Sequence, residues 1–220
     1  MQKKPWQYVS QGSQEWHDYH KNLSINASAA GVALGWRGKK ELHKYWHNKK
    51  GISMENTTVN DSMRWGNLCE KSALLTYKEY FKSVEVKTSG LAINEATPWL
   101  GASTDGLAGV DTLIEIKCPY KNGASHPYRS IPVSHFLQCQ LQMHCNNKST
   151  CHYVVYTPKS CTVHEIKFDR KFVDQVIHEL SYFHDSLKGS DPPGICANLN
   201  NLEQMAKDLA KNAKFIKKCN

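Results

Sequence analysis

The chain has 220 residues, of which 40% are hydrophobic and 22% charged, and its 28 Lys and Arg against 20 Asp and Glu give a net charge of +8. This composition argues against a disordered chain, and the length fits one main domain. No apolar run approaches the roughly 20 residues of a membrane-spanning helix, and the first residues lack the apolar segment of a secretory signal. We expect an intracellular protein without membrane association, and nothing in the sequence distinguishes nucleus from cytoplasm. The positive charge is compatible with a polyanionic partner.

The N-terminal part of the sequence favours helices. Ser13 is a good N-cap for a helix to His20, and a second helical stretch runs from about Asn26 or Ser28 to Gly35. A lysine-rich stretch then interleaves with aromatic residues, which indicates either a solvated helix or a surface that contacts phosphates. Its lysines are Lys39, Lys40, Lys44, Lys49 and Lys50.

A longer helix is predicted next, from Asp61 to about Phe81, with Asn60 or Asp61 as its cap. Glu70 lies on a partly apolar face of it. This position suits either an ordinary interfacial glutamate or a functional carboxylate.

Strands are predicted in the middle of the chain. The alternation over residues 84–93, 99–103 and 113–118 indicates three strands of an antiparallel meander, with a turn at Asp105-Gly106. Further on, Ser134 is expected to cap a helix over 135–146, which carries Gln138 on one face. Residues 151–157 and 162–168 are predicted strands.

The C-terminal part is predicted to be helical. Asp169 caps a helix whose apolar positions from Phe172 to Phe183 follow a 3.6-residue period. The segment 188–194 breaks the chain, and an amphipathic helix that ends among Lys211, Lys214, Lys217 and Lys218 follows. We therefore expect a main domain over residues 1–190 and a basic helical extension over 191–220.

The stretch from Asp105 to Lys117 carries the candidate chemistry. Strand alternation places Glu115 and Lys117 on one face, with Ile114 and Ile116 on the other. Two carboxylates and a strand carbonyl would form an oxygen cage suited to Mg²⁺ or Mn²⁺, and an adjacent ammonium could orient or help deprotonate a water nucleophile. A plain Asp-Gly hairpin is the alternative.

These residues resemble the PD-(D/E)xK nuclease signature. A larger set of sequence motifs is similar to the YqaJ-type viral recombinase branch of that superfamily, which contains phage lambda exonuclease. Six short motifs carry the resemblance. They occur in the same order as in the family, and the resemblance covers roughly residues 11 to 186. They are Gln11-Gly-Ser-Gln-Glu-Trp16-His, Ile25-Asn-Ala-Ser28, Gly66-Asn-Leu-Cys-Glu70, Ala102-Ser-Thr-Asp105-Gly-Leu107, Leu113-Ile-Glu115-Ile-Lys117-Cys-Pro119 and Gln138-Cys-Gln-Leu-Gln142-Met143.

The resemblance implies an α/β (α+β) fold with a restriction-endonuclease-like core, in which a small mixed central sheet is flanked by helices. It implies that Asp105, Glu115 and the backbone carbonyl of Ile116 bind Mg²⁺, with Mn²⁺ as a possible substitute and Glu70 as a further acidic participant. Lys117 would be the catalytic lysine, and Gln138 would position the water or the scissile phosphate.

The implied activity is hydrolysis of DNA phosphodiester bonds by an exonuclease that acts on linear double-stranded ends in recombination or repair. The implied partners are DNA, two further copies in a homotrimer and a single-strand annealing protein. Where the family has an arginine that helps bind a 5′ phosphate, this chain has His20-Lys21. The candidate DNA contacts are His20, Lys21, Ser28, Lys39 and Lys40. A nuclease-fold DNA-binding or accessory protein with weak or no catalysis, and an endonuclease, stay open as alternatives.

Overall fold

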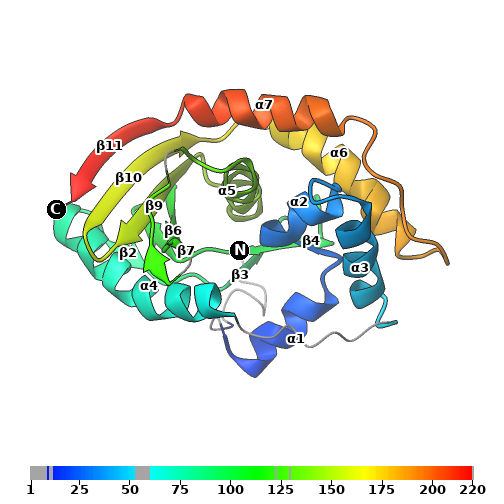
Figure 1. Ribbon diagram of the computed structural model, residues 1–220, viewed down its shortest axis with the longest axis horizontal. Helices are drawn as coiled ribbons and strands as arrows, with labels where there is room; N and C mark the ends of the chain where they lie inside the picture. Colours follow the sequence, from blue (N-terminus) through cyan, green and yellow to red (C-terminus); the bar gives the residue numbers. More distant parts are fainter. Residues whose placement is uncertain (1–8, 10–11, 53–59, 122, 129, 220) are drawn as a thin grey trace.

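The computed structural model describes residues 9, 12–52, 60–121, 123–128 and 130–219. The helices in these ranges are α1 (Gln14–Asn22), the 3-10 turn η2 (Ala27–Ala29), α2 (Ala30–Ala33), α3 (Lys39–Lys49), α4 (Asp61–Tyr80), α5 (Val133–Asn146), α6 (Arg170–Ser186) and α7 (Leu199–Lys211). Helix α5 lies at the centre of the molecule, with strands and other helices around it (Figure 1).

The strands of the described residues form three sheets. The strands are β1 (Ile25–Asn26), β2 (Val86–Lys87), β3 (Leu91–Ile93), β4 (Leu100–Ser103), β5 (Gly106–Ala108), β6 (Thr112–Lys117), β7 (Tyr120–Lys121), β8 (Ala124–Ser125), β9 (Thr150–Thr157), β10 (Ser160–Lys167) and β11 (Lys214–Cys219). The main sheet has the order β11-β10-β9-β6-β5-β2, and the smaller ones have the orders β1-β4-β3 and β7-β8. Strands β6 and β9 are parallel and the other neighbours in the main sheet are antiparallel.

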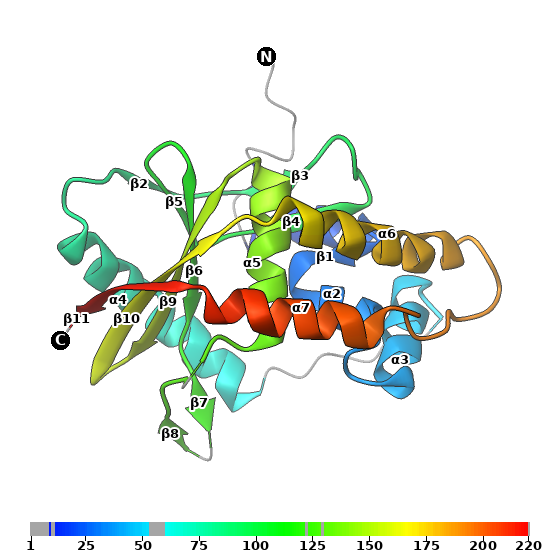
Figure 2. The ribbon, with the colours of Figure 1, turned by 90° about the horizontal axis from the view of Figure 1, so that it is seen from above.

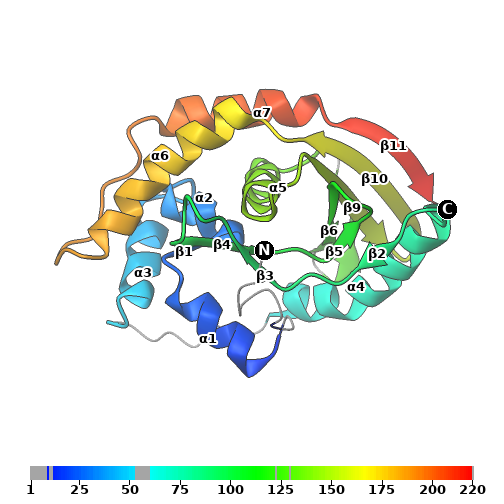
Figure 3. The same ribbon diagram turned by 180° about the vertical axis from the view of Figure 1, so that it is seen from behind.

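The main sheet is covered on both faces, by α4 on one side and α5 on the other (Figure 3). Because side chains alternate along a strand, Leu113 of β6 packs into the core around α5, whereas Ile114 and Ile116 pack with Tyr77 of α4. The predicted mixed sheet flanked by helices is confirmed. The predicted opposition of Glu115 and Lys117 to Ile114 and Ile116 follows from the same register.

Helix α5 is enclosed so completely that even its glutamines Gln140 and Gln142 are fully buried. A buried amide is tolerated when its polar atoms are bonded. Gln140 donates to the carbonyl oxygen of Lys167 at 2.8 Å and accepts from the backbone N–H of Asp169 at 2.9 Å. These bonds tie α5 to the end of β10 and the start of α6.

The predicted meander is wrong. The expected strand over 84–93 is two strands in different sheets, since β2 pairs with β5 and β3 pairs with β4. Asp105 is not in a hairpin turn but at the point where the chain leaves β4 in one sheet and enters β5 in the other. The buried hydroxyl of Thr104 fixes this switch, because it accepts from the N–H of Gly106 and lies 3.1 Å from the carbonyl oxygen of Ile114.

The predicted helix starts were mostly confirmed. Ser13, Asn60 and Asp169 each accept a backbone N–H from the first turn of their helix. Ser134 is not the N-cap of α5, because Pro132 holds that position and its carbonyl accepts from the N–H of Phe136. The stretch from Asn26 to Gly35 is a short strand, a 3-10 turn and a single helical turn instead of one helix.

The C-terminal segment differs from a simple helical extension. Helix α7 ends at Lys211, and the predicted continuation through Lys214 and Lys218 is wrong because β11 pairs there with β10. Figure 2 shows α7 and β11 in succession along one side of the molecule. Leu202 and Ala206 of α7 are fully buried in the main core. The segment beyond residue 190 thus contributes to both the core and the main sheet. The division of the chain at residue 190 stays a prediction.

No helix among the described residues is both long and apolar enough to cross a membrane.

We expect Leu202→Ala to lower the free energy of unfolding of the whole chain by about 2–5 kcal/mol, because it empties a fully buried position. Leu75→Ala on α4 is the matched control, since Leu75 is 54% exposed and its loss should cost less than about 1 kcal/mol. Urea titration followed by circular dichroism measures both. Equal stability of Leu202→Ala and the wild type would mean that α7 does not belong to the main core.

Candidate active site

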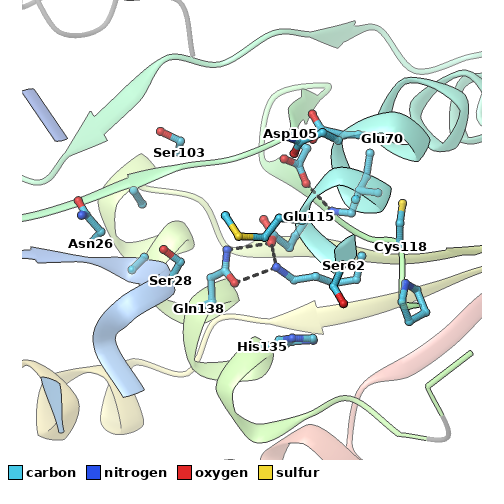
Figure 4. Close-up of a pocket in the computed structure, with 18 of the residues that line it drawn as sticks. Asn26, Ser28, Ser62, Glu70, Ser103, Asp105, Glu115, Cys118, His135 and Gln138 are labelled. Atoms are coloured by element: carbon cyan, nitrogen blue, oxygen red, sulfur yellow. Dashed lines mark hydrogen bonds and ion pairs between the residues drawn. The ribbon is translucent and has the colours of Figure 1, made fainter. Parts of the chain in front are cut away.

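A cavity of about 720 Å³ opens where the two larger sheets meet the start of α5. Its walls come from α1, the turn after β1, the first half of α4, the switch between β4 and β5, the end of β6 and the first turns of α5. Figure 4 shows Glu70, Asp105 and Glu115 on one side of this cavity and Asn26 and Ser28 on the other. The elements that meet here are far apart in the sequence.

Asp105 reaches the cavity because the chain changes sheets just before it. Its Oδ2 accepts the backbone N–H of Ile116 at 2.6 Å, and its own N–H donates to the carbonyl oxygen of Ile114 at 3.1 Å. The N–H and C=O groups of alternate residues point to the same edge of a strand, so the carbonyl of Ile116 points to the same edge of β6 as that of Ile114. Ile116 lies beyond the residues of β6 that pair with β5. An aspartate carboxylate and a backbone carbonyl therefore lie at one opening of the main sheet.

Glu115 is 3% exposed and is held by three donors. Lys117 Nζ lies 2.6 Å from Oε1, Gln138 Nε2 donates to Oε1 at 2.8 Å, and Gln142 Nε2 donates to Oε2 at 2.6 Å. Lys117 Nζ also donates to Gln138 Oε1 at 3.0 Å. A buried carboxylate needs such partners, because burial without them would favour its protonated form.

Glu70 completes a group of three neighbouring carboxylates. Burial and the charges of Glu115 and Glu70 raise the pKa of Asp105 well above its usual value. Burial and the Glu115 charge likewise raise the pKa of Glu70. Burial alone would lower the pKa of Lys117, but Glu115 and Asp105 outweigh it, so the ammonium stays protonated. The neighbouring carboxylates therefore disfavour one another's ionisation, and the charge of Lys117 does not cancel this effect.

The donor set fits a hard divalent cation. Two carboxylates, a strand carbonyl and a further glutamate are the oxygen ligands that Mg²⁺ and Mn²⁺ take, and a cation would relieve the repulsion that raises the pKa of Asp105. Among the described residues, however, no three His, Cys, Asp or Glu side chains are already spaced as metal ligands. Lys117 and Gln138 occupy Oε1 of Glu115, so metal binding requires these two side chains to move.

The predicted DNA contacts divide into two sets. His20 and Ser28 line the cavity. Burial and the charge of Lys49 lower the pKa of His20 to about 4, so its ring, stacked on Trp16, is neutral. Lys21, Lys39 and Lys40 are exposed and lie outside the lining. Their role stays a prediction.

The sequence did not single out several polar residues of the cavity. Arg37 and His135 line the cavity, and Gln142 donates a hydrogen bond to Glu115 from inside the core. Gln142 stands one helical turn after Gln138, and this i+4 spacing could have indicated it. Arg37 and His135 come from segments with no pattern that points to the strand carrying Glu115.

A family model described as the YqaJ-like viral recombinase domain matches residues 15–151. The chain belongs to this family. The matched region of the YqaJ-like domain runs from α1 into β9 and contains Glu70, Asp105, Glu115, Lys117 and Gln138.

Two solved structures have the same fold as this YqaJ-like chain. The alkaline exonuclease LHK-Exo from Laribacter hongkongensis is 23% identical with a TM-score of 0.65, and the match covers 90% of this chain and all of the other. LHK-Exo in complex with dAMP gives 22% identity, the same TM-score and the same coverage. No curated protein matches the sequence. The likeness confirms the nuclease-type α/β fold.

We expect Asp105→Asn to stabilise the protein in EDTA, because it removes a charge that burial and two glutamates disfavour and can keep the bond to Ile116. A raised pKa means that the protonated carboxyl stabilises the folded state at acidic pH and that this contribution is lost as the pH rises. The gain over the wild type should therefore be about 1–2 kcal/mol near pH 8 and shrink toward pH 4.

Urea titrations at both pH values measure this difference. Asp174→Asn on α6 is the matched control and should show no such pH-dependent gain, since Asp174 is exposed. A variant that is less stable than the wild type at pH 8 would contradict the proposed charge repulsion.

Proposed function

We propose that the protein is a metal-dependent deoxyribonuclease that hydrolyses DNA phosphodiester bonds, and that it acts as an exonuclease on linear double-stranded ends in recombination or repair. The observation that carries this proposal is the convergence of Asp105, Glu115, Lys117, Glu70 and Gln138 on one cavity from α4, β6, α5 and the connection between β4 and β5. The fold shared with an alkaline exonuclease and the membership in a recombinase family support it.

In this proposal Asp105, Glu115 and the carbonyl of Ile116 hold Mg²⁺, with Glu70 as a further ligand and Mn²⁺ as a substitute. When bound, the cation would lower the pKa of water and offset the charge that develops on the phosphate. No cysteine or serine nucleophile is required.

The side chains of this chain have separate tasks. Lys117 carries a positive charge beside Glu115, and after the movement that metal binding requires it can orient the attacking water and screen the charge on the phosphate. Gln138 bonds both Lys117 and Glu115, so its amide sets the distance between them and can position the scissile phosphate. Gln142 keeps the second oxygen of Glu115 bonded inside the core.

DNA would enter with its backbone against the donors of the cavity. His20 and Ser28 lie in its wall, and Arg37 adds a charge whose guanidinium fork suits phosphate. Lys21, Lys39 and Lys40 would contact the duplex outside the cavity. A homotrimer and an annealing partner are carried over from the family resemblance alone.

One observation favours the alternative of a DNA-binding protein with weak catalysis. Both oxygens of Glu115 are bonded to protein donors, so the carboxylate is satisfied without a metal. An endonuclease is the other alternative, since the same chemistry would cut within a strand.

The test is digestion of linear, nicked and closed circular DNA with Mg²⁺ or EDTA, with 5′ ends either phosphorylated or not. We expect metal-dependent loss of linear duplex only. Asp105→Ala, Glu115→Gln and Lys117→Ala should each lower the rate by about a thousandfold or more, because each removes a group that acts on the developing charge.

Lys171→Ala on the exposed face of α6 is the control for Lys117→Ala, and circular dichroism verifies that each variant is folded. Full activity of Glu115→Gln would rule out the mechanism. Cleavage of closed circles would identify an endonuclease, and the absence of metal-dependent cleavage of any DNA would favour the binding protein.

A further inference from the structure

His135 lines the same cavity from the first turn of α5, but the mechanism above gives it no task. Its Nδ1 lies 2.7 Å from the hydroxyl oxygen of Tyr153. Its ring and the ring of Tyr128 are in a T-shaped arrangement, with a centroid distance of 5.2 Å and an interplanar angle of 70°. The imidazole is thus held on two sides. In Figure 4 it lies in the cavity wall next to Gln138.

Tyr153 determines which nitrogen of His135 carries the proton. Tyr153 is fully buried on β9, directly beside Glu115 in the parallel register. Among the described residues its hydroxyl has one hydrogen-bond partner, Nδ1 of His135. Burial raises the pKa of Tyr153, so the hydroxyl keeps its proton and needs an acceptor. Nδ1 is the acceptor within reach, and a ring that accepts at Nδ1 carries its proton on Nε2.

The charges around His135 keep its ring neutral. Burial, followed by the positive charges of Lys117 and Arg37, lowers its pKa to about 3. A base with so low a pKa is poorly matched to accept a proton from water near neutral pH. A neutral ring with Nε2–H is instead a hydrogen-bond donor of fixed direction. The two neighbouring cations make its surroundings attractive to an anion.

We propose that His135 is a substrate-contacting residue whose Nε2–H donates to a phosphate oxygen of the DNA backbone between Lys117 and Arg37, and that Tyr153 is the positioning residue that fixes its tautomer. This inference rests on the proposed function, because DNA is the phosphate-bearing substrate of that site. It adds a neutral hydrogen-bond donor to the two neighbouring cations.

The test measures binding without cleavage, with a short 5′-phosphorylated duplex in EDTA followed by fluorescence anisotropy. Two substitutions separate the nitrogens, since the amide of Asn reproduces Nδ1 and that of Gln reproduces Nε2. His135→Asn keeps an acceptor for Tyr153 and loses the cavity donor, and we expect it to weaken binding about tenfold. His135→Gln keeps the donor and should stay within about threefold of the wild type.

Tyr153→Phe is expected to fall between the two, because the donor remains but its tautomer is no longer fixed. His178→Asn on α6 is the matched control and should bind as the wild type does, since His178 is exposed and outside the cavity. Equal affinity of His135→Asn and His135→Gln would overturn the proposal.

The ¹⁵N chemical shifts of the His135 ring in the wild-type protein give a second readout that needs no variant. A protonated Nε2 beside an unprotonated Nδ1 is expected, and the reverse tautomer or an imidazolium at pH 7 would refute the assignment. Failure of the nuclease proposal is distinguishable, because it would leave duplex binding and the tautomer unchanged while no DNA is cleaved with Mg²⁺.

Discussion

The buried charge of Glu115 is the constraint on which the centre of this molecule depends. A carboxylate that is 3% exposed must be bonded on both oxygens, and its donors come from its own strand and from α5. Gln138 and Gln142 reach this carboxylate because α5 has a particular position along β6 and a particular rotation about its own axis. The rotation then also places His135 at the cavity and Gln140 at the end of β10. The register of the central helix and the geometry of the site are thus one requirement.

The chain segment around Asp105 shows a second coupling between fold and site. Strand β4 belongs to the small sheet, and β5 belongs to the main one. The carboxylate of Asp105 substitutes for a strand partner by accepting the N–H of Ile116. Thr104 fixes the same switch with its hydroxyl. A proline would restrict the backbone there but could form no such bond. The edge of the sheet is left open where the carboxylates gather.

Local patterns were sufficient for some of this architecture and not for the rest. The two-residue period of β6 and the caps at Ser13, Asn60 and Asp169 depend on neighbours in sequence, and they were predicted correctly. The split of residues 84–93 and the strand at 214–219 depend on pairing with β5, β4 and β10, which lie elsewhere in the chain. An alternating or lysine-rich segment carries no information about which sheet edge is free. The prediction therefore failed where pairing is non-local.

The same distinction applies to the site. Asp105, Glu115 and Lys117 are close in sequence, and Gln138 and Glu70 were found by their place on helices and by the family's motifs. His135 and Arg37 carry no such signal, because their significance arises only when α5 and the loop after α2 reach the cavity. The charge of a titratable side chain also depends on its burial and on the charged residues around it. His20 is a candidate DNA contact at the place of the family's phosphate-binding arginine, yet burial and the charge of Lys49 make its ring neutral.

The neutral rings change how phosphate recognition at this cavity is to be understood. With His20 and His135 uncharged, the permanent positive charge among the described residues of the lining comes from Arg37 and Lys117, and Lys117 is already paired with Glu115. The cavity also holds three carboxylates, which oppose the attraction of these cations for a phosphate. Phosphate binding here therefore favours uncharged hydrogen-bond donors of fixed direction, because burying a further charge would cost free energy. A neutral imidazole that is oriented by a buried tyrosine is such a donor. Because Tyr153 stands beside Glu115 in the sheet, the strand pairing that places the acid also orients the donor.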